Sequence, residues 1–292
     1  MKLLSYQYNN SINVGLLTPN GVISIESLRK YTDKELNGSL ETLIEEKQFP
    51  IIKQIFEKNE SSFGESDYLN YADLHILPPV SRPEKIICVG LNYLDHVSEG
   101  PDMDVPEEPV LFSKFNNALA ADGEDIPKPL DGEQIDYECE LVIIMGETAQ
   151  DVSEEEALDY VFGYTIGNDL SVRDLQFRSG QWLLGKTPDK FAPIGPVVVT
   201  SDSINPNQLN ISTKRNGRIV QQSNTDKMIF NCAKIISYVS KYMTLKPGDL
   251  IFTGTPEGVI LGYDEGEQEW LDSGDEIQIA IEGIGTLTNR II

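Results

Sequence analysis

The sequence predicts an α+β fold that is rich in strands, and three observations support this prediction. The end of the chain is expected to be strand and turn, with strands over 250–253, 276–282 and 286–292. Asn216-Gly217 lies between two strand-like segments and predicts a tight hairpin. Helical patterns are few, and the connections are mostly local. That arrangement favours α+β over a doubly wound parallel sheet.

The first 80 residues are predicted to form a small N-terminal α/β domain. Asn20-Gly21 indicates a hairpin turn, and a helical pattern over 40–56 is broken at Pro50. The prolines of segment 76–83 are typical of a semi-rigid connection rather than of an element. We therefore predict two domains, 1–80 and 81–292. The strands expected in the first are 3–8, 13–18 and 22–24.

The second region is predicted to combine strands with a few helices. Ser153 and Glu156 match a capping box, which predicts a helix that ends near Val161. Apolar residues at helical spacing over 226–243 predict an amphipathic helix. The other expected elements are strands at 85–89, 110–113 and 164–169 and a short helix at 93–99.

Composition excludes several classes of function. The chain has 292 residues and a formal net charge of −24, so a nucleic-acid backbone would be repelled. Cys88, Cys139 and Cys232 are widely spaced and form no C-x-x-C motif, which is typical of reduced thiols in a cytosolic protein. No segment has the ~18 apolar residues that span a membrane, and the N-terminus does not resemble a signal peptide. We expect a soluble, cytoplasmic protein.

Alternating carboxylates precede an apolar run in the middle of the chain. In a strand, Asp136, Glu138 and Glu140 would share one face, and the apolar segment 141–146 indicates burial. Buried like charges need compensation, which Mg²⁺ or Mn²⁺ would supply. Asp169, at a predicted strand end, could complete such a site. The alternative is a solvated edge strand. With a metal site, removing Glu138 or Glu140 should reduce metal affinity and could stabilise the metal-free chain.

Only one of the two histidines lies in a pattern that suggests chemistry. In a helix, His96 and Glu99 would share a face, and a carboxylate beside an imidazole makes a general base. The alternative is a surface ion pair, and His75 is expected to be incidental. Segment 93–108 includes an acidic, proline-containing loop that we expect to order over bound substrate. The turn 253–258 lacks the lysine of a phosphate loop, so nucleotide binding is not expected.

Together these motifs resemble those of the fumarylacetoacetate hydrolase family, over about 85–292. The matching stretches are Gly90–Tyr93 with His96 and Glu99, 136–141, 163–176, Gly185-Lys186, 191–196, Asn216-Gly217, 245–258, Gly274-Asp275 and 283–285. The resemblance implies a β-sandwich roll, a homodimer, bound Mg²⁺ or Mn²⁺ and a small 2-oxo acid substrate.

The resemblance also implies roles for individual residues. The metal ligands would be Glu138, Glu140 and Asp169. The remaining implied roles are catalytic for His96, Glu99 and Lys186, and substrate-binding for Arg173, Gln176, Thr255 and Tyr93.

The expected reaction is cleavage of a C–C bond in a 2-oxo or β-diketo acid. It would be acylpyruvate-type hydrolysis to pyruvate through a metal-stabilised enolate. Oxaloacetate decarboxylation and a 2-oxohept-ene-dioate hydratase or isomerase reaction are alternatives, because they share that intermediate. A more remote alternative is a non-catalytic protein that binds metal and 2-oxo acid.

Overall fold

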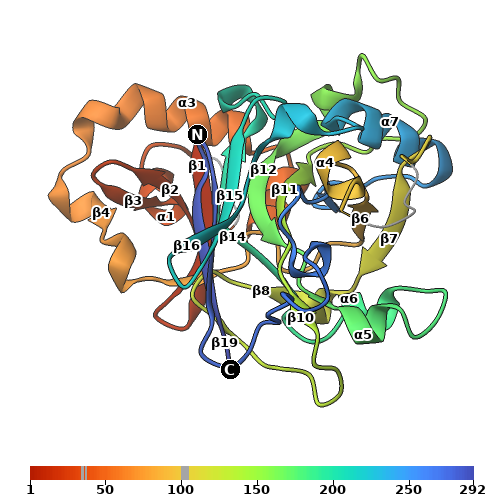
Figure 1. Cartoon of the computed structure of the whole chain (residues 1–292). Helices are drawn as coiled ribbons and strands as arrows, with labels where there is room; N and C mark the ends of the chain where they lie inside the picture. Colours follow the sequence, from red (N-terminus) through yellow and green to blue (C-terminus); the bar gives the residue numbers. More distant parts are fainter. Residues whose placement is uncertain (34–35, 37, 100–104) are drawn as a thin grey trace.

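The structure is a computed structural model that describes residues 1–33, 36, 38–99 and 105–292. The described residues form a long mixed sheet, a shorter sheet packed against its middle, and a few short helices (Figure 1). The prediction of a strand-rich α+β fold is confirmed.

The long sheet runs through both predicted domains. Strand β1 pairs antiparallel with β14, so the N-terminal hairpins extend the same sheet that holds the later strands. The predicted boundary near residue 80 thus falls within one continuous sheet, and the division into two domains stays a prediction. The order is β4 (Tyr68–Leu69), β3 (Gly21–Ser24), β2 (Ser11–Thr18), β1 (Lys2–Tyr8), β14 (Ala192–Thr200), β12 (Val161–Asn168), β11 (Cys139–Met145), β17 (Leu250–Phe252), β6 (Ile86–Gly90) and β7 (Val110–Lys114).

Two shorter strands attach beside this order. The first is β5 (His75–Leu77), which pairs with β1, so the prediction that 76–83 is only a connection is wrong at its start. The second is β8 (Leu119–Ala120), which pairs with β14. A separate two-stranded ladder joins β10 (Ile135–Asp136) to β13 (Ser171–Val172).

The second sheet packs on the middle of the long one and completes a sandwich. Its hairpin turns at Asn216 and Gly217, which have φ of 51° and 80°, as the sequence predicted. Strand β18 alternates between buried and half-buried residues, because one face is turned to the core. The order is β16 (Arg218–Asn224), β15 (Asn210–Arg215), β18 (Glu276–Ile281), β19 (Gly285–Ile291) and β9 (Asp125–Ile126).

The helices differ from the predicted ones mainly in length. The 40–56 pattern divides into two helices before Pro50, and this proline lies in the first turn of the second one, where it is tolerated. The helix predicted over 226–243 begins only at Cys232, because Asn231 caps it by accepting from the amide of Lys234. The α-helices are α1 (Ile25–Arg29), α2 (Leu40–Glu45), α3 (Phe49–Asn59), α4 (Leu94–Val97), α5 (Arg173–Gln176), α6 (Leu183–Lys186) and α7 (Cys232–Tyr242).

One predicted helix does not form. The amide of Glu156 donates to Ser153 Oγ at 3.3 Å, as in a capping box, yet only a 3-10 turn follows, at Ala157–Tyr160. The chain then enters β12 at Val161, and the carbonyl of Tyr160 already accepts from the amide of Gly146. Pairing within the sheet therefore overrides the local helix signal.

The remaining short helices are 3-10 turns. They lie at Glu60–Ser62, Glu65–Asp67, Tyr71–Asp73, Asn116–Ala118, Ser201–Ser203, Thr225–Lys227 and Ile260–Gly262. No helix in the described residues is long and apolar enough to cross a membrane.

Strand β11 is buried along its whole length, which confirms the interpretation of its apolar run. Leu141 and Ile143 face one core, between the two sheets, while Val142 and Ile144 face the other, toward the N-terminal helices. Glu140 lies in the same strand and is therefore buried as well. The three cysteines are buried and unpaired, as expected.

Buried Asn92 ties three separated segments together just before α4. Its Nδ2 donates to the carbonyls of Phe230 and Thr253 at 2.9 and 2.6 Å, and its Oδ1 accepts from the amide of Phe230 at 2.8 Å. These contacts fix the start of α4 against the end of β17.

Replacing this side chain should therefore destabilise the fold. Asn92→Ala leaves three buried backbone groups without partners, so we expect a loss of about 3 kcal/mol or more in the free energy of unfolding. Urea denaturation would measure it, with Asn70→Ala as the control, since Asn70 is exposed and bonds only to near neighbours. Equal stability of the two variants would contradict the role given to Asn92.

Candidate active site

Three predicted carboxylates come together at the centre of the long sheet. Glu138 precedes β11, Glu140 lies within it, and Asp169 follows β12. Antiparallel pairing places Cys139 opposite Asn168, and this register brings the carboxylates side by side. One ligand oxygen from each lies within 4.8 Å of the others. An all-oxygen set of this kind suits Mg²⁺ or Mn²⁺, so the residues present fit a divalent cation.

Asp136, which the strand pattern placed on one face with Glu138 and Glu140, is not part of the cluster that could hold a metal ion. The chain leaves strand geometry between β10 and β11, so the strict alternation from Asp136 to Glu138 is lost. The Asp136 carboxylate accepts instead from Arg173 Nε and Nη2 at 2.9 and 2.8 Å. It also accepts from the amides of Ile260 and Leu261 at 2.8 and 3.1 Å. Asp136 therefore anchors an arginine and a turn.

Three buried cations compensate the carboxylate cluster. Lys186 Nζ lies between Glu138 Oε2 and Asp169 Oδ2, at 2.8 and 3.0 Å. Arg173 Nη2 lies 2.7 Å from Glu138 Oε1. The third cation is Lys114, whose Nζ lies 2.6 Å from Asp169 Oδ1. Sequence reasoning missed Lys114, because a single lysine at the end of a strand carries no local signal of burial.

The two glutamates of the cluster differ in their electrostatics. Burial raises the pKa of Glu138, but the charges of Lys186 and Arg173 outweigh it and hold that pKa below its ordinary value. Burial, the charge of Asp169 and then that of Glu138 raise the pKa of Glu140 well above its ordinary value. Among the described residues, the amide of Gly254 is the one hydrogen-bond donor to the carboxylate of Glu140, at 2.6 Å.

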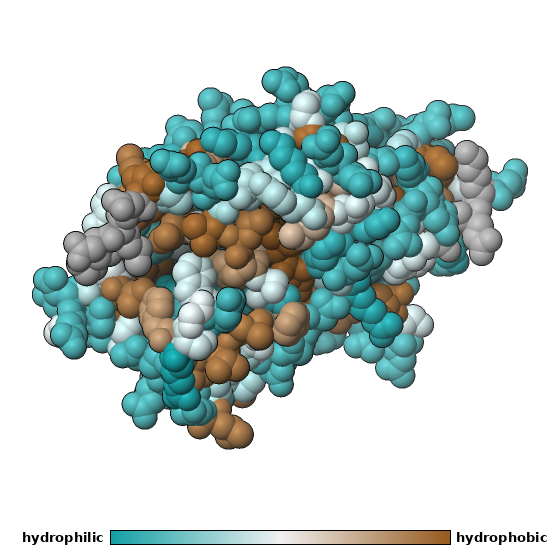
Figure 2. Space-filling view, turned by 90° about the vertical axis from the view of Figure 1, so that its right-hand side faces the viewer, coloured by the Kyte–Doolittle hydropathy of each residue, from teal (hydrophilic) through white to brown (hydrophobic). Residues whose placement is uncertain are grey.

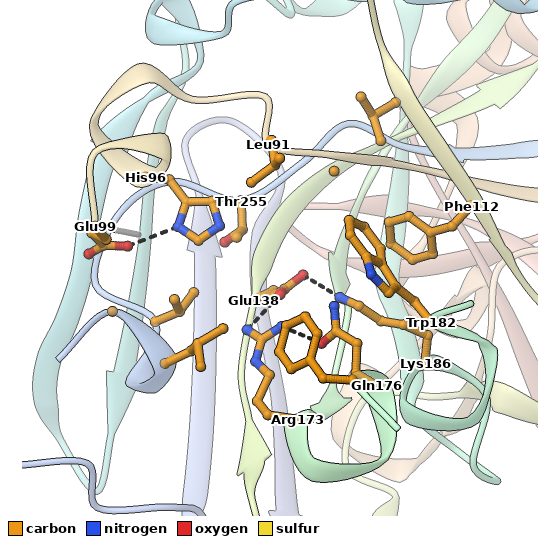
Figure 3. A pocket seen from close by; sticks show the side chains of 16 residues that line it. Leu91, His96, Glu99, Phe112, Glu138, Arg173, Gln176, Trp182, Lys186 and Thr255 are labelled. Carbon is orange, nitrogen blue, oxygen red and sulfur yellow. Dashed lines mark hydrogen bonds and ion pairs between the residues drawn. The ribbon is translucent and has the colours of Figure 1, made fainter. Parts of the chain in front are cut away.

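The predicted pair of His96 and Glu99 is formed. His96 Nδ1 lies 2.8 Å from Glu99 Oε2, on the short helix α4 and the turn that follows it. An ionised carboxylate only accepts, so Nδ1 is the donor in this pair, and in the neutral imidazole Nε2 then has the lone pair. The imidazole lies beside Thr255 on one wall of the pocket (Figure 3). This placement favours the general-base interpretation over a surface ion pair.

The segment from Gly254 to Gly262, after β17, holds the site carboxylates through its backbone. Besides the amides bound to Asp136 and Glu140, the amide of Gly258 donates to Glu99 Oε1 at 2.7 Å. One loop thus positions a candidate metal ligand, the acid–base pair and the arginine anchor. The sequence showed a glycine-rich turn here but not which groups its amides would bind.

These groups face one cavity of about 360 Å³. Its charged and polar lining contains seven of the ten predicted site residues: His96, Glu99, Glu138, Arg173, Gln176, Lys186 and Thr255. Much of the remaining lining is apolar and includes Leu91, Phe112, Phe177, Trp182, Val259 and Leu261. Apolar side chains also gather around a hollow on the face shown in Figure 2.

Tyr93 and the segment 93–108 were both expected to contact the substrate. Tyr93 is fully buried and is not among the residues that line the cavity. The geometry therefore does not favour contact between its side chain and a substrate. The predicted lid, 93–108, includes residues 100–104, which lie outside the described residues. In its described part the acid–base pair is already in place, and closure over substrate stays a prediction.

Comparison with known proteins identifies the class. The family model described as "Fumarylacetoacetate (FAA) hydrolase C-terminal" matches residues 85–292, and the chain belongs to this family. It is 40% identical to a fumarylacetoacetate hydrolase domain-containing protein 2 homolog of Dictyostelium discoideum, over 100% of this chain and 97% of that protein. It is also 40% identical to a mitochondrial oxaloacetate tautomerase of Rattus norvegicus, over 82% and 79%.

A solved structure adds information on ligands. The maleylpyruvate hydrolase of Sphingobium sp. SYK-6, in complex with manganese(II) and pyruvate, superposes with a TM-score of 0.79 at 27% identity, covering 100% of this chain and 99% of that one. The family assignment made from the sequence is confirmed, and relatives in the family are enzymes that act on small 2-oxo acids.

The raised pKa of Glu140 generates a prediction about stability. Glu140→Gln keeps the acceptor for Gly254 but removes the unpaired charge. Without divalent cations we expect the variant to be more stable than the wild type at pH 7, by about 1 to 3 kcal/mol. A carboxyl whose folded pKa is raised contributes stability at low pH and loses it as the pH rises through that pKa. The gain should therefore shrink toward pH 4.

Chemical denaturation in EDTA at pH 4 and pH 7 would measure this difference. Glu138→Gln serves as the contrast, because it leaves Lys186 and Arg173 without one of their partners and should destabilise. The sequence led us to expect that removing either glutamate could stabilise the metal-free chain, and the structure supports this expectation for Glu140 but not for Glu138. Added Mn²⁺ should stabilise the wild type and have little effect on Glu140→Gln. A less stable Glu140→Gln in EDTA would contradict the interpretation.

Proposed function

We propose that the chain is a divalent-cation-dependent enzyme that interconverts the keto and enol forms of oxaloacetate. The observation that carries this proposal is that the His96–Glu99 pair lines the same cavity as Glu138, whose carboxylate adjoins those of Glu140 and Asp169. Proton transfer at the carbon beside a keto group needs a base there and electrophilic stabilisation of the keto oxygen. The 40% identity to an oxaloacetate tautomerase supports the choice of reaction.

Glu138, Glu140 and Asp169 would hold the cation. When bound, it would polarise the carboxylate and keto oxygens of a 2-oxo acid. The cation used and the compartment of the protein stay predictions, as does the homodimer.

Arg173 and Gln176 would orient the substrate. Arg173 Nη1 donates to Gln176 Oε1 at 2.9 Å, and its other nitrogens bind Asp136 and Glu138, so the guanidinium is fixed in the cavity wall. A fixed guanidinium suits a carboxylate, because it loses little conformational freedom on binding. Lys186 would face the keto oxygen from the same side.

His96 would move the proton. With Nδ1 bound to Glu99, Nε2 takes a proton from C3 and the electron pair of that bond forms a C2–C3 double bond. The keto oxygen takes up the displaced electron pair and then a proton from the imidazolium, so His96 is neutral again. Glu99 holds the ring orientation and stabilises the transient positive charge.

The second candidate is the reaction expected first from the sequence, hydrolysis of an acylpyruvate. The apolar wall of the cavity favours it, because an alkyl or alkenyl group beyond C3 would contact Trp182 and Phe112 there. His96 would then take its proton from water, and the hydroxide formed would attack the distal carbonyl. The bond between that carbonyl and C3 would break, and C3 would take the proton back from the imidazolium to give pyruvate and a carboxylic acid. Oxaloacetate decarboxylation and hydratase or isomerase chemistry stay alternatives.

Parallel assays would separate these reactions. With Mg²⁺ or Mn²⁺ we expect rapid loss of the ultraviolet absorbance of enol-oxaloacetate, and little or no activity in EDTA until metal is restored. Acetylpyruvate and fumarylpyruvate cleavage and CO₂ release from oxaloacetate would be followed side by side. Full tautomerase activity in chelator would refute the metal site. Acylpyruvate cleavage faster than tautomerisation would make acylpyruvate hydrolysis the favoured function.

His96 can be tested against the other histidine. We expect His96→Asn to lower the rate of tautomerisation by about 10²- to 10⁴-fold, the usual contribution of a general base, with metal affinity unchanged. His75→Asn is the matched control, since His75 is exposed at the start of β5. Steady-state kinetics and calorimetric Mn²⁺ titration of both variants would measure the effects. Equal activity of the two variants would remove His96 from the mechanism.

A further inference from the structure

Gly262 lies against the carboxylate of Glu99, where a side chain would collide with it. A Cβ built on Gly262 would be 2.6 Å from Glu99 Cδ, and 2.8 and 2.9 Å from Oε2 and Oε1. All three distances are far below van der Waals contact. Gly262 ends the 3-10 turn Ile260–Gly262 and does not have the positive φ that would require glycine. Backbone conformation therefore does not explain this glycine.

The turn that carries Gly262 cannot withdraw without breaking other contacts. The amides of Ile260 and Leu261 both donate to Asp136, and Asp136 in turn binds Arg173. The Glu99 side chain has several rotatable bonds, and within the part of the chain that the structure describes its carboxylate is held by His96 and by the amide of Gly258. A methyl group at position 262 would therefore displace the carboxylate rather than the turn.

We propose that Gly262 is a positioning residue of the acid–base pair: the absence of a side chain there makes room for the Glu99 carboxylate between His96 and the amide of Gly258. The inference rests on the proposed function, since it assigns Gly262 to the pair that moves the proton. Its consequence is that the fold tolerates a small side chain at this position, whereas the orientation of His96 does not.

Gly262→Ala tests this, with Gly266→Ala as the matched control. Gly266 lies four residues further on, and a Cβ there would have nothing within 4 Å. We expect Gly262→Ala to lower kcat by about 10- to 100-fold, as misplacement of a catalytic group by about an ångström does, with KM and Mn²⁺ affinity nearly unchanged. Gly266→Ala should stay within twofold of the wild type.

A spectroscopic readout separates this inference from the proposed reaction. The chain has two histidines, so ¹⁵N-labelled imidazoles give simple spectra that His75→Asn assigns. In the wild type and Gly266→Ala we expect a downfield, slowly exchanging Nδ1 proton of His96, bonded to Glu99. In Gly262→Ala this signal should be lost. Glu99→Gln should lose most activity, and adding Gly262→Ala to it should cost little more.

Each outcome decides a distinct claim. A retained Nδ1 signal and wild-type kcat in Gly262→Ala would overturn the role of Gly262. Failure of Gly262→Ala to fold would also overturn it, because the inference requires the Glu99 carboxylate to move aside while the fold stays intact. Full activity of Glu99→Gln would refute the proposed mechanism, while loss of the signal in Gly262→Ala would still support the positioning role.

Discussion

The centre of this molecule depends on one constraint: its buried carboxylates need positive charge close to them. Asp136, Glu138, Glu140 and Asp169 are all buried, and an unpaired carboxylate away from water costs several kcal/mol. Cations bind three of them: Arg173 binds Asp136 and Glu138, Lys186 binds Glu138 and Asp169, and Lys114 binds Asp169. For Glu140, the described residues supply a backbone amide and no cation. The uncompensated charge therefore lies where a divalent cation would bind.

The surrounding fold is arranged to make this concentration of charge possible. Strands β11 and β12 lie in the middle of the long sheet and are covered on both faces by apolar residues. Ion pairs and amides in such an environment are poorly screened and hold side chains in fixed positions. The polar lining of the cavity is thus held rigidly. Beside it, Trp182 and Phe112 pack edge to face with ring centroids 5.3 Å apart, and the Lys186 ammonium lies 4.9 Å from the centre of the Phe112 ring.

Sequence reasoning found what local patterns encode. Alternation and turn residues predicted most strands and the Asn216-Gly217 hairpin, and the carboxylate pattern led to the cluster of Glu138, Glu140 and Asp169. It failed where contacts over long sequence separations decide. Lys114 is 55 residues from Asp169 in the sequence. The helix expected after Ser153 yielded to sheet pairing, and nothing local shows that Asp136 faces a turn more than a hundred residues away.

The loop after β17 supports the site through its backbone, so the number of residues in the loop matters more than the identity of their side chains. Its amides at positions 254, 258, 260 and 261 bind Glu140, Glu99 and Asp136. Surface loops ordinarily tolerate insertions and deletions during evolution. Here a single added or deleted residue would turn some of these amides away from their carboxylates. Divergence in this segment should therefore proceed by substitution at constant length, and new specificities should arise from exchanges among the apolar residues that line the cavity.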